Sequence, residues 1–380
     1  MFGRADLIYR EGAEAMTALY LIGDTLLYGC LALLIGFFSV QLIPRSYRPD
    51  VSLSIRWVRM LIVLMLLSFS LSVLRIVLYL YEEIGFWITL QSVLLTFEAG
   101  NAWILMALWS VLLLIVINRS SLSPGRIKLG VFLVMAMVVT FAWSGHASSI
   151  KGAEGMLVHS IHALAVFIWT GGLLILGFWS PSDRNWGIFL EWFKPLVTLC
   201  FLLIVGSGIY LMSVVVQVEE YSDSWILPYG QALLWKHVLI LPVLIIGIMN
   251  GKWSYASPER SFEVRRMRMR MEGILILLLF TATAWLGQQE PPHSIKDTLQ
   301  SSGAGPLSGF LFPSLRFTYS DIRFEPTMIS LFLMAISLLF VGLLVYVIRS
   351  TQDSIKTLYL GLGVSISLFF AALYSISVYL

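Results

Sequence analysis

The sequence is poor in charge for its length. Charged residues make up 12% of its 380 residues, with 25 Lys and Arg against 22 Asp and Glu. A soluble globular domain carries roughly 25% charged residues, so this composition excludes an ordinary soluble domain. The net charge of +3 comes from Arg and Lys in a few short loops. No nucleic-acid partner is expected, because that requires an extended basic surface.

Cysteine is also scarce, and both cysteines, Cys30 and Cys200, lie inside apolar segments. A structural disulfide framework is therefore excluded, and the cysteines indicate no redox compartment. The alternation of polar and apolar residues that marks barrel strands is missing too. The first residues mix acidic and basic side chains, unlike the cationic start of a cleaved signal peptide, so we expect the first apolar run to be retained.

What the chain has in abundance is long apolar runs, since 58% of its residues are hydrophobic. A helix needs about 20 apolar residues to cross a bilayer, and that length recurs along the chain. We therefore predict an all-α, polytopic helical membrane protein with the lipid bilayer as its first partner. The ten expected transmembrane helices are 15–43, 55–81, 88–117, 127–146, 155–179, 188–217, 228–250, 269–289, 327–348 and 356–378.

The loops between these helices alternate in charge. Loops 44–56, 118–128 and 251–270 are basic, whereas loops 82–87 and 217–227 are acidic. Because cytoplasmic loops carry the excess of Lys and Arg, both termini are predicted to be extracytoplasmic. We expect three parts: a membrane domain of eight helices over 1–289, an extracytoplasmic loop over 290–326, and a two-helix extension over 327–380. His293, in that external loop, is expected to be solvated.

Ionisable groups inside a membrane are costly and mark functional sites by default. His146 is predicted to end the fourth helix at the outer face, with a turn over 147–154. The fifth helix starts at that face and carries Met156, His159 and His162 at steps of three, which form a slanted track along it. Imidazole and thioether donors together suit copper. The alternative is a set of histidines hydrogen-bonded in a wet outer vestibule.

Further polar residues fall within the other predicted helices. They are Asp24, Glu98, Asn101, Lys236, His237 and Glu272. His237 is a further candidate metal ligand, and the others form either a polar pathway and second shell or a buried network that fixes helix packing. Glu272 is expected at the inner end of its helix, as an exit group or as an interfacial residue. Lys236 would obstruct a cation, so it is expected to pair with a carboxylate or to act as a gate.

Three blocks of short motifs carry a family resemblance. They are GHA (145–147) with HALA (162–165) and WTGGL (169–173); GSG (206–208) with YGQALLWK (229–236); and EG (272–273) with PP (291–292). In this order and spacing, over roughly residues 15–295, the sequence resembles the copper resistance protein D (CopD) family of bacterial inner-membrane proteins.

The resemblance implies a multi-pass plasma-membrane protein that handles copper and moves it inward. It also strengthens the prediction that Lys236 and Glu272 are functional, because both fall on motif positions of the family. Copper, as Cu(I) or Cu(II), is then the bound ion. Many family members pair with or are fused to a small extracytoplasmic copper-binding β-sandwich. Only about 14 residues precede the first predicted helix, so no such domain is expected there, and a separate copper chaperone is a candidate partner.

Two other functions remain open on the residues alone. Histidines on facing helices, such as His146 or His162 with His237, ligate b-type haem in other proteins, which would make this a haem- or quinone-linked electron-transfer protein. The second is a structural or sensory subunit that binds no metal. The sequence contains neither GxxxxGK[ST] nor an aspartyl-phosphate signature, so we expect no ATP hydrolysis and no enzymatic activity.

Overall fold

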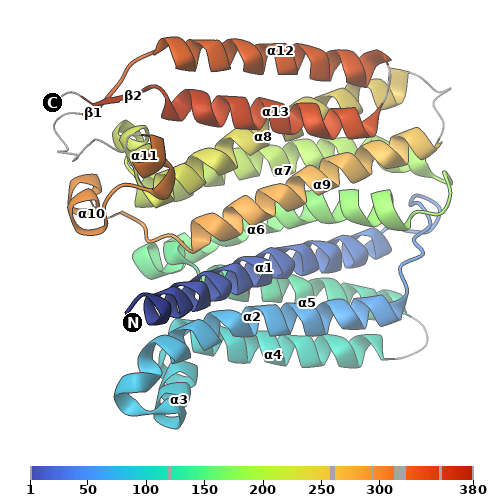
Figure 1. Cartoon of the computed structure of the whole chain (residues 1–380). Helices are drawn as coiled ribbons and strands as arrows, with labels where there is room; N and C mark the ends of the chain where they lie inside the picture. The colour runs from blue at the N-terminus through green and yellow to red at the C-terminus, as the bar shows by residue number, and fades with distance from the viewer. Residues whose placement is uncertain are drawn as a thin grey trace. The chain divides into compact units, whose positions relative to one another are not determined.

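The computed structural model describes residues 2–118, 122–256, 262–292, 294–311, 322–350 and 353–378 (Figure 1). His293, expected above to be solvated, lies outside these residues. The chain forms two compact units, Met1–Leu211 and Met212–Leu380, and each is described by itself. The two units meet in the chain at residues 211–212, whereas the sequence predicted a boundary at the loop 290–326. The predicted domain organisation stays a prediction.

The first unit is a bundle of long helices that pack mainly through sequence neighbours. Its elements are α1 (Phe2–Leu42), α2 (Ile55–Ile84), α3 (Phe86–Thr96), α4 (Glu98–Ile117), α5 (Pro124–Trp143), α6 (His146–Trp179) and most of α7 (Trp186–Val215). Helix α1 is central, because it packs against α2, α5 and α6. Pro124 opens α5 at a position where proline's missing N–H costs no hydrogen bond.

The second unit combines four long helices with a cap of short elements. In chain order it contains η1 (Val218–Glu220), η2 (Asp223–Ile226), α8 (Pro228–Ala256), α9 (Phe262–Gly287), α10 (Ile295–Ser302), α11 (Pro306–Leu311), β1 (Ile322–Phe324), α12 (Met328–Ser350), α13 (Ser354–Leu373) and β2 (Ile376–Val378). Helix α13 packs against α12, α8 and α9, so the final helix pair shares one body with the helices before it. The predicted loop 290–326 carries α10, α11 and β1.

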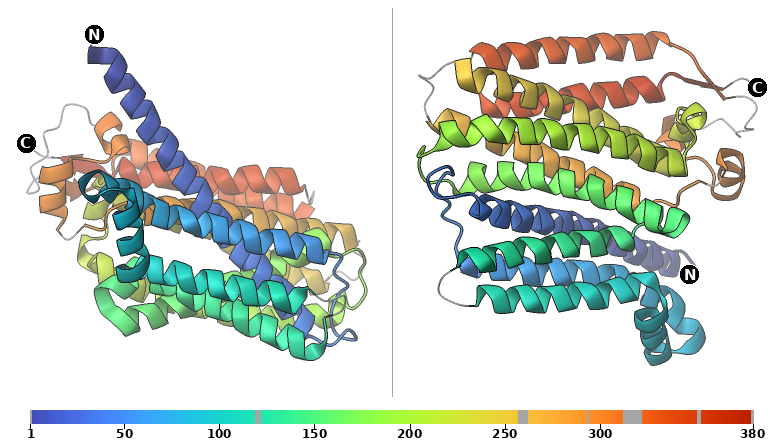
Figure 2. Two further views of the ribbon diagram at one scale, coloured as in Figure 1. Left: turned by 90° about the horizontal axis from the view of Figure 1, so that it is seen from below. Right: turned by 180° about the vertical axis from the view of Figure 1, so that it is seen from behind.

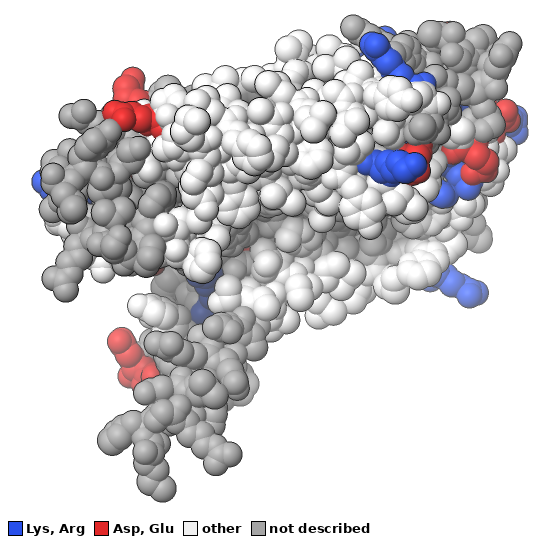
Figure 3. All heavy atoms as spheres, turned by 45° about the horizontal axis from the view of Figure 1, so that its top comes forward, with Lys and Arg blue, Asp and Glu red and all other residues white. Residues whose placement is uncertain are grey.

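The predicted number of ten membrane helices is confirmed. Among the described residues, ten helices are long and apolar enough to cross a membrane. Many of their large apolar side chains face outward, as expected where lipid replaces water. Figure 3 shows charged side chains gathered near the helix ends, with a mostly uncharged band between them. The chain is therefore a polytopic helical membrane protein, and an even number of spans leaves both termini on one side.

The closest helix packing joins α1 to α6 through glycine. A Cβ at Gly171 would overlap the carbonyl oxygen of Ala32 and come within 2.7 Å of the Gly36 nitrogen. In the converse direction, a Cβ at Gly36 would overlap the backbone of Gly171. Small residues allow such approach in membranes, where packing replaces the hydrophobic effect between helices. The interpretation of the Gly171–Gly172 pair as a packing device is consistent with this contact.

The predicted third helix, 88–117, is wrong as a single element. The chain breaks at Phe97, with φ −88° and ψ 142°, between α3 and α4. Figure 2 shows α3 lying across the ends of α2 and α4. The bend presses the α3 backbone onto Gly100, where a Cβ would overlap the carbonyl of Val93. Uniform apolarity through residues 88–97 concealed this break, because hydropathy measures burial and not direction.

Two other boundaries also differ from the prediction. Helix α9 begins at Phe262 and not at 269, because the arginine-rich segment continues the helix. Helix α13 ends at Leu373, and Ile376–Val378 then pairs antiparallel with Ile322–Phe324. This two-stranded ribbon is the only sheet among the described residues, and it ties the end of the chain to the segment before α12.

Candidate metal site

The candidate site is built on α6, which begins at His146 and changes direction at Gly152. Gly152 has φ 57° and ψ −134°, a backbone conformation that favours glycine. The prediction that His146 ends the fourth helix and that a turn covers 147–154 is therefore wrong. Helix α5 already ends at Trp143, and the residues on both sides of Gly152 are helical. A second glycine makes the bend compact, because a Cβ at Gly155 would overlap the carbonyl of Ala147.

His159 is held from the side by the end of α5. Its Nδ1 lies 3.2 Å from the carbonyl oxygen of Ala142, and its ring lies 5.4 Å from that of Phe141, centroid to centroid. The ring also rests on Gly145, where a Cβ would come within 2.7 Å of it. A carbonyl oxygen only accepts hydrogen bonds, so Nδ1 carries the hydrogen. The lone pair of the neutral ring is therefore on Nε2.

His162 is held by α7 in the same tautomer. Its Nδ1 lies 3.0 Å from the hydroxyl oxygen of Ser207. Ser207 donates its one hydrogen to the carbonyl of Leu203 in its own helix, so towards His162 it can only accept. Nδ1 of His162 therefore donates, and Nε2 carries the lone pair. The ring lies over Gly208, where a Cβ would stand 3.4 Å from Cε1.

These two histidines are a pair of neighbours on the surface of α6, with His159 in contact with α5 and His162 in contact with α7. Residues three apart are neighbours on a helix, with Cβ atoms about 5–6 Å apart. Met156 is half-buried, one further step of three toward the start of the helix. No group of three His, Cys, Asp or Glu side chains close enough to hold a metal occurs in the described ranges. The donors that α6 brings together are thus two imidazoles, with one thioether nearby in the helix.

His146 does not join this pair inside the bundle. Its side chain is exposed at the first residue of α6. It nevertheless directly follows Gly145, whose backbone contacts the His159 ring. The structure therefore places His146 at the solvent edge of the site, next in the chain to the residue that supports His159.

Sequence reasoning missed a polar contact beside the pair. The phenol of Tyr210 on α7 donates a 2.5 Å hydrogen bond to Glu154 Oε1 on α6. Neither residue was predicted to take part in the site, and Ser207 was quoted only as part of GSG. The glycines flanking Ser207 were the available signal, because they clear space for an approaching ring.

The predicted polar residues of the first four spans are scattered. Asp24 is half-buried on α1, one turn before Tyr28, whose ring contacts Phe141 at 5.5 Å. Glu98 is the first residue of α4 and is exposed, so it is not buried in a span. Its carboxylate is stabilised there by the positive end of the helix dipole. Asn101 is half-buried and its backbone N–H donates to the Phe97 carbonyl.

The second unit holds the remaining predicted residues. Nδ1 of His237 lies 2.6 Å from the phenol oxygen of Tyr221, whose ring meets Trp225 edge-on. Lys236 is half-buried beside it, and no ion pair joins it to another residue of the described ranges, so the expected carboxylate partner is not found there. Glu272 is 4% exposed and lies well inside α9. Its predicted place at the end of the helix is wrong, because α9 starts earlier, and its role as an exit group or an interfacial residue stays a prediction.

Two family models match the chain. The model described as "Copper resistance protein D-like, N-terminal domain" matches residues 15–156, and the model described as "Copper resistance protein D" matches residues 187–286. The chain belongs to the copper resistance protein D family. No curated protein and no solved structure matches it.

Family membership gives the chain a copper-related function in a membrane. The two matched regions include most of the predicted polar residues, among them His146, Lys236, His237 and Glu272. His159 and His162 lie between the matched regions, in the uncovered stretch 157–186. The case for these two histidines therefore rests on their geometry.

Proposed function

We propose that this protein carries copper ions inward across a bacterial plasma membrane, with His159 and His162 as ligands near the outer end of α6. Copper is the cargo of this process and not a resident cofactor. Met156 supplies a soft third donor, and His146 meets the ion first at the solvent edge. The protein acts as a transporter and not as an enzyme.

The observation that carries the proposal is the shared tautomer of the two histidines. A metal-binding imidazole typically donates its second N–H to a carbonyl, a carboxylate or another acceptor, which fixes the ring and raises its basicity. His159 donates to Ala142 and His162 donates to Ser207. Both rings are thereby set to offer Nε2 to a metal ion.

Membrane potential supplies a sufficient driving force. A single positive charge moving down a 100 mV potential gains about 2.3 kcal/mol, and the sequence carries no nucleotide-binding motif that would supply more. Inward movement of a copper cation therefore needs no energy source within this chain. A separate extracytoplasmic chaperone that delivers copper to His146 fits the exposed position of that residue.

The experiment compares purified full-length protein and four variants by copper titration and metal analysis. Cu(I) and Cu(II) are titrated side by side. The double variant H159Q/H162Q is expected to lose specific binding, and copper accumulation in cells that express it is expected to fall to the level of cells without the protein. S207A is expected to bind copper roughly 10–100-fold more weakly, because His162 loses its acceptor.

Two controls separate ligation from folding. S207T keeps the hydroxyl and is expected to retain affinity, whereas S213A removes an exposed serine of the same helix and is expected to change nothing. Unchanged copper binding in H159Q/H162Q would contradict the proposal. A Soret band in the purified protein would instead identify a haem protein.

A further inference from the structure

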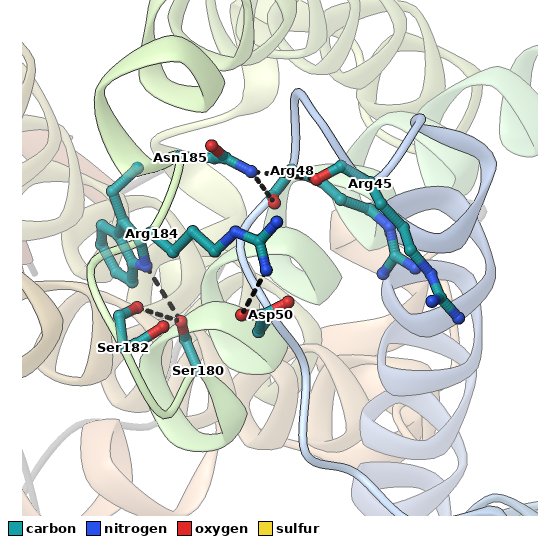
Figure 4. Close-up of polar contacts among 8 residues, drawn as sticks. Arg45, Arg48, Asp50, Ser180, Ser182, Arg184 and Asn185 are labelled. Atoms are coloured by element: carbon teal, nitrogen blue, oxygen red, sulfur yellow. Dashed lines mark hydrogen bonds and ion pairs between the residues drawn. The ribbon is translucent and has the colours of Figure 1, made fainter.

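A second polar cluster lies at the opposite end of the first unit, where loop 43–54 meets the segment 180–185 (Figure 4). The side-chain amide of Asn185 donates to two backbone carbonyls of that loop, to Arg45 at 2.9 Å and to Arg48 at 3.1 Å. Asn185 has φ 58°, a left-handed conformation that asparagine tolerates better than most residues. The amide is thus held where it can clamp a turn of the neighbouring loop.

The segment that carries Asn185 is itself fixed. The hydroxyl of Ser180 accepts the indole N–H of Trp186 at 2.9 Å, and Trp186 is 1% exposed. Ser52 donates from both its backbone and its hydroxyl to the carbonyl of Trp179. These contacts attach the start of α7 to the loop between α1 and α2, so the clamp has a rigid base.

The clamped turn places two guanidinium groups together. Figure 4 shows the Arg45 and Arg48 side chains extending to the same side of the loop, away from Arg184 and Asp50. No ion pair in the described ranges involves either of them, whereas Arg184 lies 3.9 Å from Asp50. Nε of Arg48 is buried without a hydrogen-bond partner.

The cluster is short of negative charge. Burial and the nearby charge of Arg45 both lower the pKa of Arg48, and Asp50 opposes this only in part. Two adjacent like charges are unfavourable unless an anion neutralises them. A buried guanidinium N–H also costs free energy while it makes no hydrogen bond. An anionic ligand with several acceptor oxygens would neutralise the two charges and accept the unpartnered N–H of Arg48, and planar guanidinium forks suit phosphate.

The position of the pair identifies the source of that anion. The loop joins the end of one span, at Leu42, to the start of the next, at Ile55, so it lies at headgroup level. Exposed Tyr47 lies between the two arginines in the sequence and exposed Trp57 lies in the first turn of α2, and aromatic residues of this kind concentrate at membrane interfaces. Basic pockets on the cytoplasmic side of membrane helices bind anionic lipids. We propose that Arg45 and Arg48, clamped by Asn185, bind the phosphodiester of an anionic phospholipid.

The test counts bound lipid on the full-length protein by native mass spectrometry, with short-chain phosphatidylglycerol against phosphatidylcholine. Wild type is expected to retain phosphatidylglycerol selectively. R45Q/R48Q is expected to bind it roughly tenfold or more weakly, since each charge-assisted hydrogen bond is strong. N185G keeps every charge and accommodates the left-handed backbone, yet loses the clamp, so its binding is expected to fall as well.

The matched control is R56Q/R59Q, which removes the same charge from the same end of the unit. Arg59 donates to the side chain of Asn118 and lies outside the clamped turn. Equal losses in the two double variants would overturn the proposal in favour of diffuse attraction. Wild-type binding in N185G would overturn it as well. So would displacement of the lipid by millimolar inorganic phosphate, which would identify a site for free phosphate.

Discussion

Tyr221 and His237 share a hydrogen bond whose direction decides what His237 can bind. Burial raises the pKa of Tyr221 to about 12, and the neighbouring indole of Trp225 opposes the shift. The phenol therefore keeps its hydrogen at neutral pH. Its partner in the described ranges is Nδ1 of His237, so that nitrogen accepts and Nε2 is protonated. His237 is thus set in the reverse way to His159 and His162, which is why the proposed ligand set omits it.

Replacing Tyr221 by Phe gives a pH-dependent prediction. A raised phenol pKa in the folded state contributes stability that is present below pH 10 and is lost as pH rises toward 12. Y221F should lack that loss. The stability difference between wild type and Y221F is therefore expected to change by about 2 kcal/mol over this interval. Thermal unfolding in detergent measures it.

Tyr79 provides the control, because its side chain is 84% exposed. Y79F should follow the wild-type pH profile throughout. Parallel profiles for wild type and Y221F would show that the phenol is not held in its neutral form by the fold.

At the scale of single residues, the sequence identified the candidate metal ligands but not the hydrogen bonds that fix their ring nitrogens. Histidines and a methionine at steps of three were visible on one predicted helix, and the structure confirms that helix. The role of Ser207 was not visible, because a serine in a span ordinarily bonds its own preceding turn. Only the register of α6 against α7 shows that its oxygen also accepts from His162. Such register depends on tertiary packing and has no local sequence signal.

Among the elements, α1 and α6 depend most on the absence of side chains. G171A would place a Cβ against the Ala32 carbonyl and the Gly36 backbone, none of which can rotate away. The two helices must separate, and we expect the free energy of unfolding to fall by about 1–3 kcal/mol, as in other overpacked cores. Denaturant unfolding in detergent, followed by circular dichroism, is the measurement.

A control for G171A is available on α7. No atom lies within 4 Å of a Cβ built at Gly206. G206A should therefore be neutral or gain up to about 1 kcal/mol from helix propensity. If G171A were as stable as G206A, close glycine packing would not be what holds α1 to α6.

Element boundaries were predicted well where apolarity ends and poorly where direction changes. The limits of most spans agree with the prediction to within a few residues, because charge marks the bilayer edge. The prediction missed the bends at Phe97 and Gly152. It also missed the helical residues before Met269. Bends follow from backbone contacts at Gly100 and Gly155, and arginines near a helix end keep the helix while their charged heads reach water.

At the scale of the whole molecule, the charge pattern of the loops and the position of the histidines together predict how the protein is oriented in the membrane. If basic loops are cytoplasmic, the Arg45–Arg48 pair faces the cytoplasm and His146 faces the outside, since four spans precede it. Under the proposed function, copper then enters at the histidines and the membrane potential draws it inward. With the opposite orientation the histidines would face the cytoplasm, at the end where an inward-moving cation leaves. Orientation therefore decides which end of the protein receives the ion first, whereas the membrane potential sets the direction of movement.

Cysteine accessibility tests this orientation. The two native cysteines, Cys30 and Cys200, are both buried. They are replaced in a cysteine-free background, C30A/C200A, so that only an introduced cysteine can be labelled. Ser46, after the first span, and Glu219, after the sixth, are exposed positions for single cysteines. A membrane-impermeant maleimide should label S46C only in inside-out vesicles and E219C only in right-side-out vesicles. The reverse pattern would place His146 on the cytoplasmic side and contradict its proposed role as the first residue to meet the ion, and labelling of both from one side would contradict the ten-span topology.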